Sequence, residues 1–359
     1  MNDADVCATL LRVVVGRSGS VLPDTVRFPR WESLATAERI TPLLYYVVDT
    51  LPTDLGDRER AEVERCQRSA LAHCVWLEHQ LLGVASTLAE HGIGTAVLKG
   101  AATAHLDYPD PSWRQYADVD LLIDPSDRIA ATALLRRAGW SQGYALPKGH
   151  GAYTHAVTLM GERMELDLHQ RIAHRALGVL VPTGELLARV VPLDIAGADL
   201  RALGDIDRLV HAAIHMVSSR GQARRLSSVA DVLVMADRRP QLADEVLEQS
   251  ERCRVRSLVE RAVVDAYASA QLAVHEAWAE AMRRPIRSRY RLVDRAYLSP
   301  SRRPVTEELA YLRVLPSWTD RWRYATGYLS TDADYEAQHG RSGALAQLRY
   351  VLSKLRTHR

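Results

Sequence analysis

One stretch near the middle of the first half of the chain alternates apolar and polar residues with the period of a β-strand. Residues 117–124 place four apolar side chains on one face and Asp118, Asp120 and Asp124 on the other, interrupted only by Leu122. Carboxylates two residues apart on a strand lie roughly 6–7 Å from each other at the backbone, so their side chains can converge on a divalent cation. The alternative is an exposed edge strand with solvated aspartates. Asp124 directly precedes Pro125, where a helix-entry role is favoured.

A second stretch repeats this pattern. Residues 163–169 place Met164, Leu166 and Leu168 on one face and Glu165, Asp167 and His169 on the other. If the apolar faces of both stretches pack in one core, Asp167 lies on the same side of the sheet as Asp118 and Asp120. Three aspartates on adjacent strands form a site of hard oxygen ligands, which favours Mg²⁺ or Mn²⁺ over zinc. Such a site can hold metals that bridge the phosphates of a nucleotide.

Helical periodicity and turn residues define the other elements. Before residue 175 the pattern predicts a long amphipathic helix over 58–91, a strand over 95–98, helices over 101–106 and 128–138, and two strands joined at Gly161-Glu162, over 153–160 and 163–169. After His174 helices dominate, over 184–190, 205–218, 226–236, 242–252 and 255–272. A basic amphipathic helix is predicted over 345–354, where docking on the domain is favoured over a membrane or nucleic-acid patch.

These elements predict an α+β fold, with a small mixed β-sheet core, flanking helices and a mainly α-helical domain after it. The predicted divisions are an N-terminal helical cap at 1–57, a catalytic core at 58–175, and a helical C-terminal domain with a basic tail at 176–359.

Composition narrows the function classes. The chain has 359 residues, of which 47% are hydrophobic and 25% charged, and a formal net charge of +2, so no bulk field marks it as a nucleic-acid or membrane binder. Its four cysteines form neither a disulfide framework nor a metal-ligand pair, which suits the reducing cytoplasm. No apolar run approaches the ~20 residues of a membrane span. We therefore expect a cytoplasmic protein that does not bind membranes, and no feature specifies its oligomeric state.

A nucleotide-binding site also needs a structural element that binds the phosphates. The turn Lys99-Gly100 lies between a predicted strand and a predicted helix, so backbone N–H groups at the helix start can cradle an anion there. Lys99 or Arg114 could add positive charge, and Arg114 stands four residues before Asp118.

Several of these motifs, in this order, resemble one family. They are Leu98-Lys99-Gly100, Tyr108, Arg114, Asp118-Val119-Asp120-Leu121-Leu122 and Leu166-Asp167-Leu168-His169, and the similarity continues to His215, Arg225-Leu226 and Asp231-Val232. This pattern, over roughly residues 60–240, resembles the uncharacterised bacterial nucleotidyltransferase family of the DNA polymerase β-like superfamily.

The resemblance implies roles for the motif residues. Asp118 and Asp120 would hold the metals, and Asp167 would be a third ligand and possible proton acceptor. The turn Lys99-Gly100 would stand where the superfamily grips phosphates, although no serine follows Gly100. His169 would contact a phosphate or, as we favour, orient Asp167.

Two pairs of residues further along have two interpretations each. His211 and His215 have metal-binding spacing on a helix but, without a third ligand nearby, are favoured as core or hydrogen-bonding residues. Arg225 and Asp231 would close the cleft or form an ion pair.

The sequence thus predicts a Mg²⁺-dependent nucleotidyltransferase that moves an NMP from an NTP such as ATP to an acceptor and releases pyrophosphate. The acceptor could be a small molecule, a peptide, a protein or a tRNA. Alternatives are γ-phosphoryl transfer of the kinase type, or a non-catalytic protein that binds a nucleotide or RNA.

Overall fold

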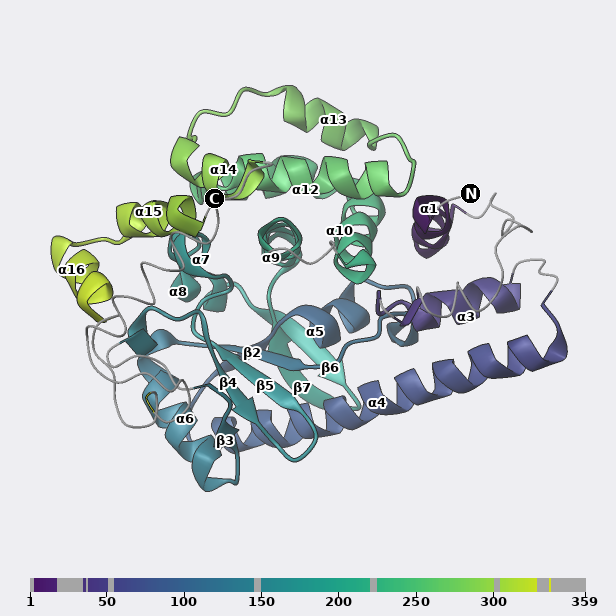
Figure 1. The fold of residues 1–359 in the computed structure, drawn as a ribbon, viewed down its shortest axis with the longest axis horizontal. Coiled ribbons are helices and arrows are strands. Elements are labelled where there is room, and N and C mark those ends of the chain that lie inside the picture. Colours follow the sequence, from purple (N-terminus) through teal and green to yellow (C-terminus); the bar gives the residue numbers. More distant parts are fainter. Residues whose placement is uncertain are drawn as a thin grey trace.

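The computed structural model describes residues 3–17, 35–36, 38–50, 55–144, 150–219, 225–299, 304–327 and 336 (Figure 1). It has an α+β fold built on a seven-stranded mixed sheet of order β3-β4-β5-β2-β1-β7-β6. The strands are β1 (Thr95–Val97), β2 (Val119–Ile123), β3 (Ser141–Gln142), β4 (Ala156–Met160), β5 (Glu165–His169), β6 (Val191–Ile195) and β7 (Ala198–Ala202). The predicted fold class is confirmed.

The centre of the sheet contains both alternating stretches. Strand β2 pairs in parallel with β5 and antiparallel with β1, and the register places Asp120 directly opposite Asp167. Strand β5 also forms the predicted hairpin with β4, in which Thr158 lies opposite Asp167. The pairing therefore brings the two acidic strand faces together, as the alternation predicts.

The sheet is covered on both faces. The helices before and within it are α1 (Asp3–Val14), α3 (Thr41–Thr50), α4 (Asp57–Ala89), α5 (Lys99–Leu106), α6 (Arg128–Arg137), α7 (Arg175–Leu180) and α8 (Thr183–Leu187). The later ones are α9 (Asp205–Ser218), α10 (Leu226–Arg238), α11 (Ala243–Arg252), α12 (Arg256–Ser269), α13 (Glu276–Arg283), α14 (Arg291–Leu298), α15 (Pro304–Val314) and α16 (Trp318–Gly327). Figure 1 shows the long helix α4 along one face of the sheet and the bundle around α9, α10 and α12 above the other.

The alternation in β2 matches these two layers. Val119, Leu121 and Ile123 pack in the cluster that includes the buried residues of α4 and α6. Leu122 points the other way and packs in the cluster formed with the helical layer. The apolar residue that interrupts the acidic face is therefore explained, because the helical layer covers that face next to Asp120.

Strands β6 and β7 are absent from the predicted elements. They form a hairpin whose turn residues, Ala196 and Gly197, both have positive φ angles of 54° and 82°. Proline in a strand is tolerated at a sheet edge, and Pro192 lies in β6, the last strand of the order. Because β7 pairs with β1, the sheet extends past residue 175 into the part of the chain predicted to be helical. The division into three domains otherwise stays a prediction.

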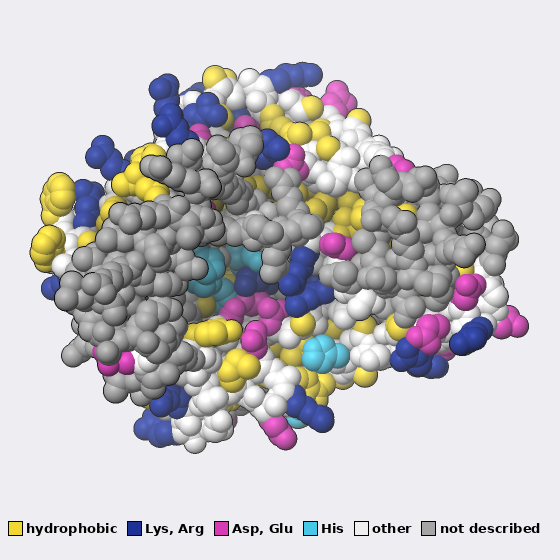
Figure 2. Space-filling view, in the orientation of Figure 1, with side chains coloured by type: hydrophobic (Ala, Val, Ile, Leu, Met, Phe, Trp, Pro, Cys, Tyr) yellow, Lys and Arg dark blue, Asp and Glu magenta, His cyan; other side chains and the backbone are white. Residues whose placement is uncertain are grey.

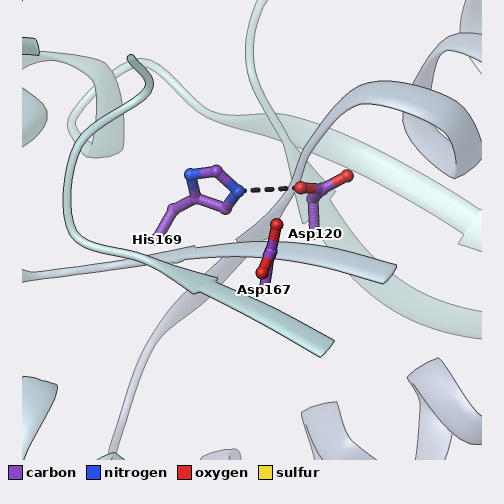
Figure 3. Close-up of side chains that lie close together, drawn as sticks. All are labelled: Asp120, Asp167 and His169. Atoms are coloured by element: carbon purple, nitrogen blue, oxygen red, sulfur yellow. Dashed lines mark hydrogen bonds and ion pairs between the residues drawn. The ribbon is translucent and has the colours of Figure 1, made fainter. Parts of the chain in front are cut away.

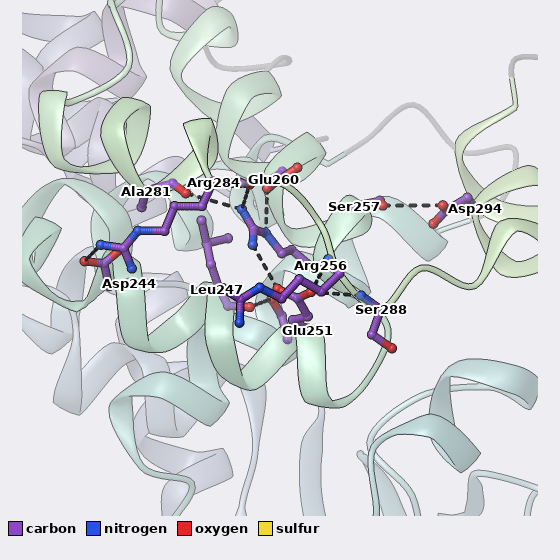
Figure 4. A network of polar contacts seen from close by, with 12 residues as sticks. Asp244, Leu247, Glu251, Arg256, Ser257, Glu260, Ala281, Arg284, Ser288 and Asp294 are labelled. Carbon is purple, nitrogen blue, oxygen red and sulfur yellow. Dashed lines mark hydrogen bonds and ion pairs between the residues drawn. The ribbon is translucent and has the colours of Figure 1, made fainter.

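The helical layer has its own buried polar network (Figure 4). Arg256 donates to Glu260 at 2.8 Å, to Glu251 at 2.9 Å and to the carbonyl oxygen of Arg284 at 2.7 Å. These bonds tie α11 and α12 to the segment after α13. A buried guanidinium is stabilised only when its donors are satisfied in this way.

The predicted helices are confirmed to within a few residues: the structure has helices over 57–89, 99–106, 128–137, 183–187, 205–218, 226–238, 243–252 and 256–269. The predicted helix over 345–354 lies outside the described residues. Within the described part of the chain, no helix combines the length and apolar character needed to cross a membrane.

Candidate functional site

Two carboxylates and an imidazole meet where β2 and β5 lie side by side (Figure 3). One potential ligand atom from each of Asp120, Asp167 and His169 lies within 4.8 Å of the others, and this is the one such group found among the described residues. The parallel register places the two aspartates in neighbouring positions, and His169 follows Asp167 on the same strand face.

Asp120 is buried, and one of its two carboxylate oxygens makes two polar contacts. Its Oδ1 accepts a hydrogen bond from Lys99 Nζ at 2.6 Å and lies 2.7 Å from His169 Nε2. Burial disfavours the carboxylate, but the charge of Lys99 and the hydrogen bond from His169 outweigh it and hold the pKa of Asp120 well below its ordinary value. Asp120 is therefore an anion over the whole physiological range.

Lys99 occupies an unusual backbone position. It is the first residue of α5 and has a φ of 46°, in the left-handed region that side chains other than glycine seldom adopt. Its ammonium group lies 3.5 Å from His169 Nε2 as well as next to Asp120. The residue predicted to grip phosphate thus contacts the carboxylate cluster.

Asp118 lies just before β2 and outside the group of Asp120, Asp167 and His169. Burial and the nearby charge of Asp120 raise its pKa, despite the opposing effects of Lys99 and Arg39. Its side chain lines a pocket on the helical side of the cluster. Asp118 therefore lies beside the pair that Asp120 forms with Asp167, and its role as a metal ligand stays a prediction.

His169 does not orient Asp167 as predicted. Its Nε2 faces Asp120, and its Nδ1 lies 3.2 Å from the carbonyl oxygen of Arg171. Asp167 instead accepts a hydrogen bond from Thr158 Oγ1 at 2.6 Å. The correction follows from the register, because Thr158 is the residue directly opposite Asp167 in the β4–β5 hairpin.

Arg114 is engaged with a carboxylate of the helical layer. Its Nε and Nη2 donate to the two carboxylate oxygens of Asp231 at 2.7 and 2.8 Å, and Tyr108 donates to Asp231 at 3.0 Å. Burial lowers the pKa of Arg114, but the charge of Asp231 more than compensates and raises it. Such a bidentate buried pair connects the segment before β2 to α10. If Arg114 bound a phosphate, as the sequence predicts, the phosphate would compete with Asp231 for the guanidinium group.

Gly100 is required for close packing. A Cβ atom added there would lie 2.4 Å from Tyr116 Cβ and 2.8 Å from Tyr116 Cγ. The absence of a side chain therefore lets the start of α5 approach the segment that leads to β2, next to the carboxylates.

The pocket beside Asp118 is rich in charged and polar side chains, and Figure 2 shows Lys/Arg, Asp/Glu and His side chains gathered at the centre of this face. Its lining includes Arg39, Lys99, Gly100, Arg114, Asp118, Arg208, His211, His215, Arg225, Ser227, Ser228 and Asp231. The site thus has an acidic side on the sheet and a mainly basic side on the helical layer.

The donor atoms suit a hard divalent cation. Two carboxylates from the neighbouring strands β2 and β5, with an imidazole near them, offer the oxygen-rich environment that Mg²⁺ and Mn²⁺ favour. Lys99 supplies one positive charge to the same carboxylate that would bind the ion.

Some of these residues were not found from sequence. Thr158 could have been, because the tight turn at Gly161-Glu162 fixes which residue of β4 lies opposite Asp167. Arg39 could not, because an isolated arginine outside any motif carries no signal of its position in the fold.

The sequence matches, over residues 26–267, the family described as uncharacterised nucleotidyltransferase. Among solved structures, the chain is similar to an antigenic nucleotidyltransferase-like protein from Paracoccidioides brasiliensis. That match has 18% identity and a TM-score of 0.33, and covers 55% of this chain and 93% of the other. A comparison with curated proteins finds no match.

Proposed function

Because the chain belongs to the uncharacterised nucleotidyltransferase family, we propose that it transfers an NMP group from an NTP to an acceptor with release of pyrophosphate. The reaction would use a divalent cation, Mg²⁺ or Mn²⁺, bound at Asp120 and Asp167, with Asp118 as the third proposed ligand. The order of motifs around these residues also supports a place in the DNA polymerase β-like superfamily.

The observation that carries this proposal is the pairing of Asp120 with Asp167 across two parallel strands. Packing alone gives no reason to place two acidic side chains beside each other in the middle of a sheet, since like charges repel, and Lys99 supplies only one positive charge to the pair. A bound cation would offset this repulsion. When bound, it would also neutralise charge on the phosphates during in-line displacement.

The chain's own residues would divide the remaining work. The oxygen nucleophile of the acceptor attacks the α-phosphorus of the NTP, the bond from that phosphorus to the bridging oxygen breaks, and pyrophosphate leaves. Asp120 is a poor proton acceptor, because Lys99 and His169 stabilise its carboxylate. Asp167 is only partly buried and accepts a hydrogen bond from the neutral hydroxyl of Thr158, which favours it as the group that takes the acceptor's proton.

The proposal is tested by incubating the protein with each NTP, labelled separately at the α- and γ-phosphate, with Mg²⁺ or Mn²⁺ and candidate acceptors. The acceptor panel contains small metabolites, peptides, proteins and tRNA. We expect the α-label in a product whose mass rises by one NMP. Transfer of the γ-label with a rise of one phosphate would instead identify a phosphotransferase.

The matched variants are Asp120→Asn and Asp124→Asn. Asp120→Asn removes a central ligand and should lower transfer by more than about a hundredfold. Asp124 lies at the other end of β2, where its carboxylate accepts hydrogen bonds from the backbone N–H and the hydroxyl of Ser126, so Asp124→Asn should retain activity. Equal activity of both variants would contradict the proposed metal centre.

A further inference from the structure

The pocket beside Asp118 contains an arginine, Arg39, whose charge is only partly offset by the nearby carboxylates of Asp118 and Glu165. The side chain of Arg39 makes no hydrogen bond or ion pair with any residue in the described part of the chain. Arg39 and Arg225 line the same pocket. Burial and the charge of Arg225 lower the pKa of Arg39, although the charge of Asp118 opposes this effect.

The other arginines of the pocket differ from Arg39. Arg114 forms its bidentate pair with Asp231, and Arg208 donates to both carboxylate oxygens of Asp107 at 2.9 and 3.0 Å. These two cations are balanced by carboxylates of the protein. Arg39 is the one for which an added anion would supply the missing charge.

A second, independent feature is an unsatisfied buried histidine. His211, on α9, is 3% exposed and lines the same pocket, and its Nε2 has no hydrogen-bond partner. A buried polar atom left without a partner costs about 1–3 kcal/mol. His215 lies one turn further along α9 and lines the pocket too. A ligand with acceptor oxygens would remove this cost.

A third feature is the start of α10. This helix has 13 residues, and the backbone N–H of its first residue, Leu226, donates to the Glu38 carboxylate at 2.6 Å. Ser227 and Ser228, the next two residues of its first turn, line the pocket. The N-terminus of a helix carries a partial positive charge and N–H groups that favour phosphate.

We propose that this pocket is a polyphosphate subsite, in which Arg39, His211 and the start of α10 bind the β- and γ-phosphates of the NTP. The inference rests on the proposed function. Asp118 joins the two sites, because it lines the pocket and lies next to Asp120. An NTP with its α-phosphorus at Asp120 and Asp167 would therefore extend its two outer phosphates toward the basic side.

The subsite can be tested without metal or acceptor. Binding of inorganic pyrophosphate is measured by titration calorimetry in EDTA at low salt. In Arg39→Asn the charge is removed, while asparagine tolerates the φ of 57° at this position. We expect its pyrophosphate affinity to fall at least tenfold. The control is Arg68→Gln, which removes an exposed arginine of α4 and should leave the affinity unchanged.

His211→Phe distinguishes a binding role from a structural one. Phenylalanine has a similar shape and removes the unsatisfied nitrogen, so the melting temperature of the protein without ligand should stay the same or rise, while pyrophosphate binds more weakly. Unchanged pyrophosphate affinity in both Arg39→Asn and His211→Phe would overturn the subsite.

Competition identifies the source of the phosphates. If they belong to the NTP, saturating pyrophosphate should exclude NTP from the protein. Simultaneous binding of both would instead assign the pocket to a phosphate of the acceptor and overturn the inference. Both results are independent of turnover, so a protein that binds pyrophosphate as expected but transfers no NMP would refute the proposed function alone.

Discussion

The ion pair between Lys99 and Asp120 can be tested with Lys99→Met. Methionine has a similar length and the same backbone restrictions, so the strain of the left-handed φ at this position is unchanged and only the charge is removed. The pair joins Lys99 Nζ to Asp120 Oδ1 at 2.6 Å, with side chains 23% and 2% exposed. The variant therefore isolates the contribution of the ammonium group.

The expected magnitude follows from this geometry. Unit charges 2.6 Å apart attract each other by about 6 kcal/mol at an effective dielectric constant of ~20, and the cost of dehydrating both groups offsets part of that. Removing one partner of a buried pair destabilises a protein by about 3–5 kcal/mol. Because His169 still contacts Asp120, we expect the lower end, about 3 kcal/mol, in the free energy of unfolding.

The same variant tests whether Lys99 and a divalent cation compete for Asp120. Urea unfolding is followed in EDTA and with excess Mn²⁺, for the wild type and Lys99→Met. We expect the variant to be less stable in EDTA, to gain more stability from Mn²⁺, and to bind Mn²⁺ at least tenfold more tightly.

Arg136→Met removes an exposed positive charge from α6 and should match the wild type in both conditions. If Lys99→Met is as stable as the wild type in EDTA and gains no more from Mn²⁺, Lys99 is not the counter-charge of Asp120.

Three further predictions concern packing, buried charge and pH. Gly100→Ala would place a Cβ 2.4 Å from Tyr116 and should cost about 1–3 kcal/mol in urea unfolding, whereas Gly83→Ala in α4, with nothing within 4 Å, should stabilise by about 0.5–1 kcal/mol. Arg256→Leu leaves two carboxylates without their shared partner and should cost about 3 kcal/mol; no loss would show that this network contributes nothing. Burial and the charge of Lys99 lower the pKa of His211 in the folded protein. In the unfolded chain this histidine binds a proton below about pH 6.5, whereas in the folded protein it stays neutral. Stability should fall between pH 7.5 and 5.5 by up to about 1.4 kcal/mol per pH unit for this proton, and less in His211→Phe.

The sequence predicted those parts of the fold in which local pattern and burial agree. In β2 and β5 the alternation determines which face is apolar, so the parallel pairing of Asp120 and Asp167 follows once both strands share a core. Strands β6 and β7 were missed because Pro192 indicates an end to regular structure, and only the position of β6 at the sheet edge makes proline acceptable there.

The side-chain partners within the site were harder to predict. His169 can reach either carboxylate from its position in β5, and only the three-dimensional arrangement selects Asp120. Arg114 and Asp231 are 117 residues apart, and sequence proximity made Asp118 the more obvious neighbour of Arg114. Local periodicity gives the face on which a residue lies, but long-range pairs depend on how the layers pack.

The candidate site requires both layers of the protein. The acidic residues belong to the sheet, whereas His211 and the start of α10 belong to the helical layer. The layers are joined at the pocket by Arg114 with Asp231 and by Arg208 with Asp107, two bidentate pairs with limited exposure. Such pairs have a defined geometry, so they fix the distance between the acidic and basic sides. The same contacts that cover the apolar part of the sheet therefore position the basic residues opposite the carboxylates, which is the arrangement that an extended polyphosphate beside a metal ion requires.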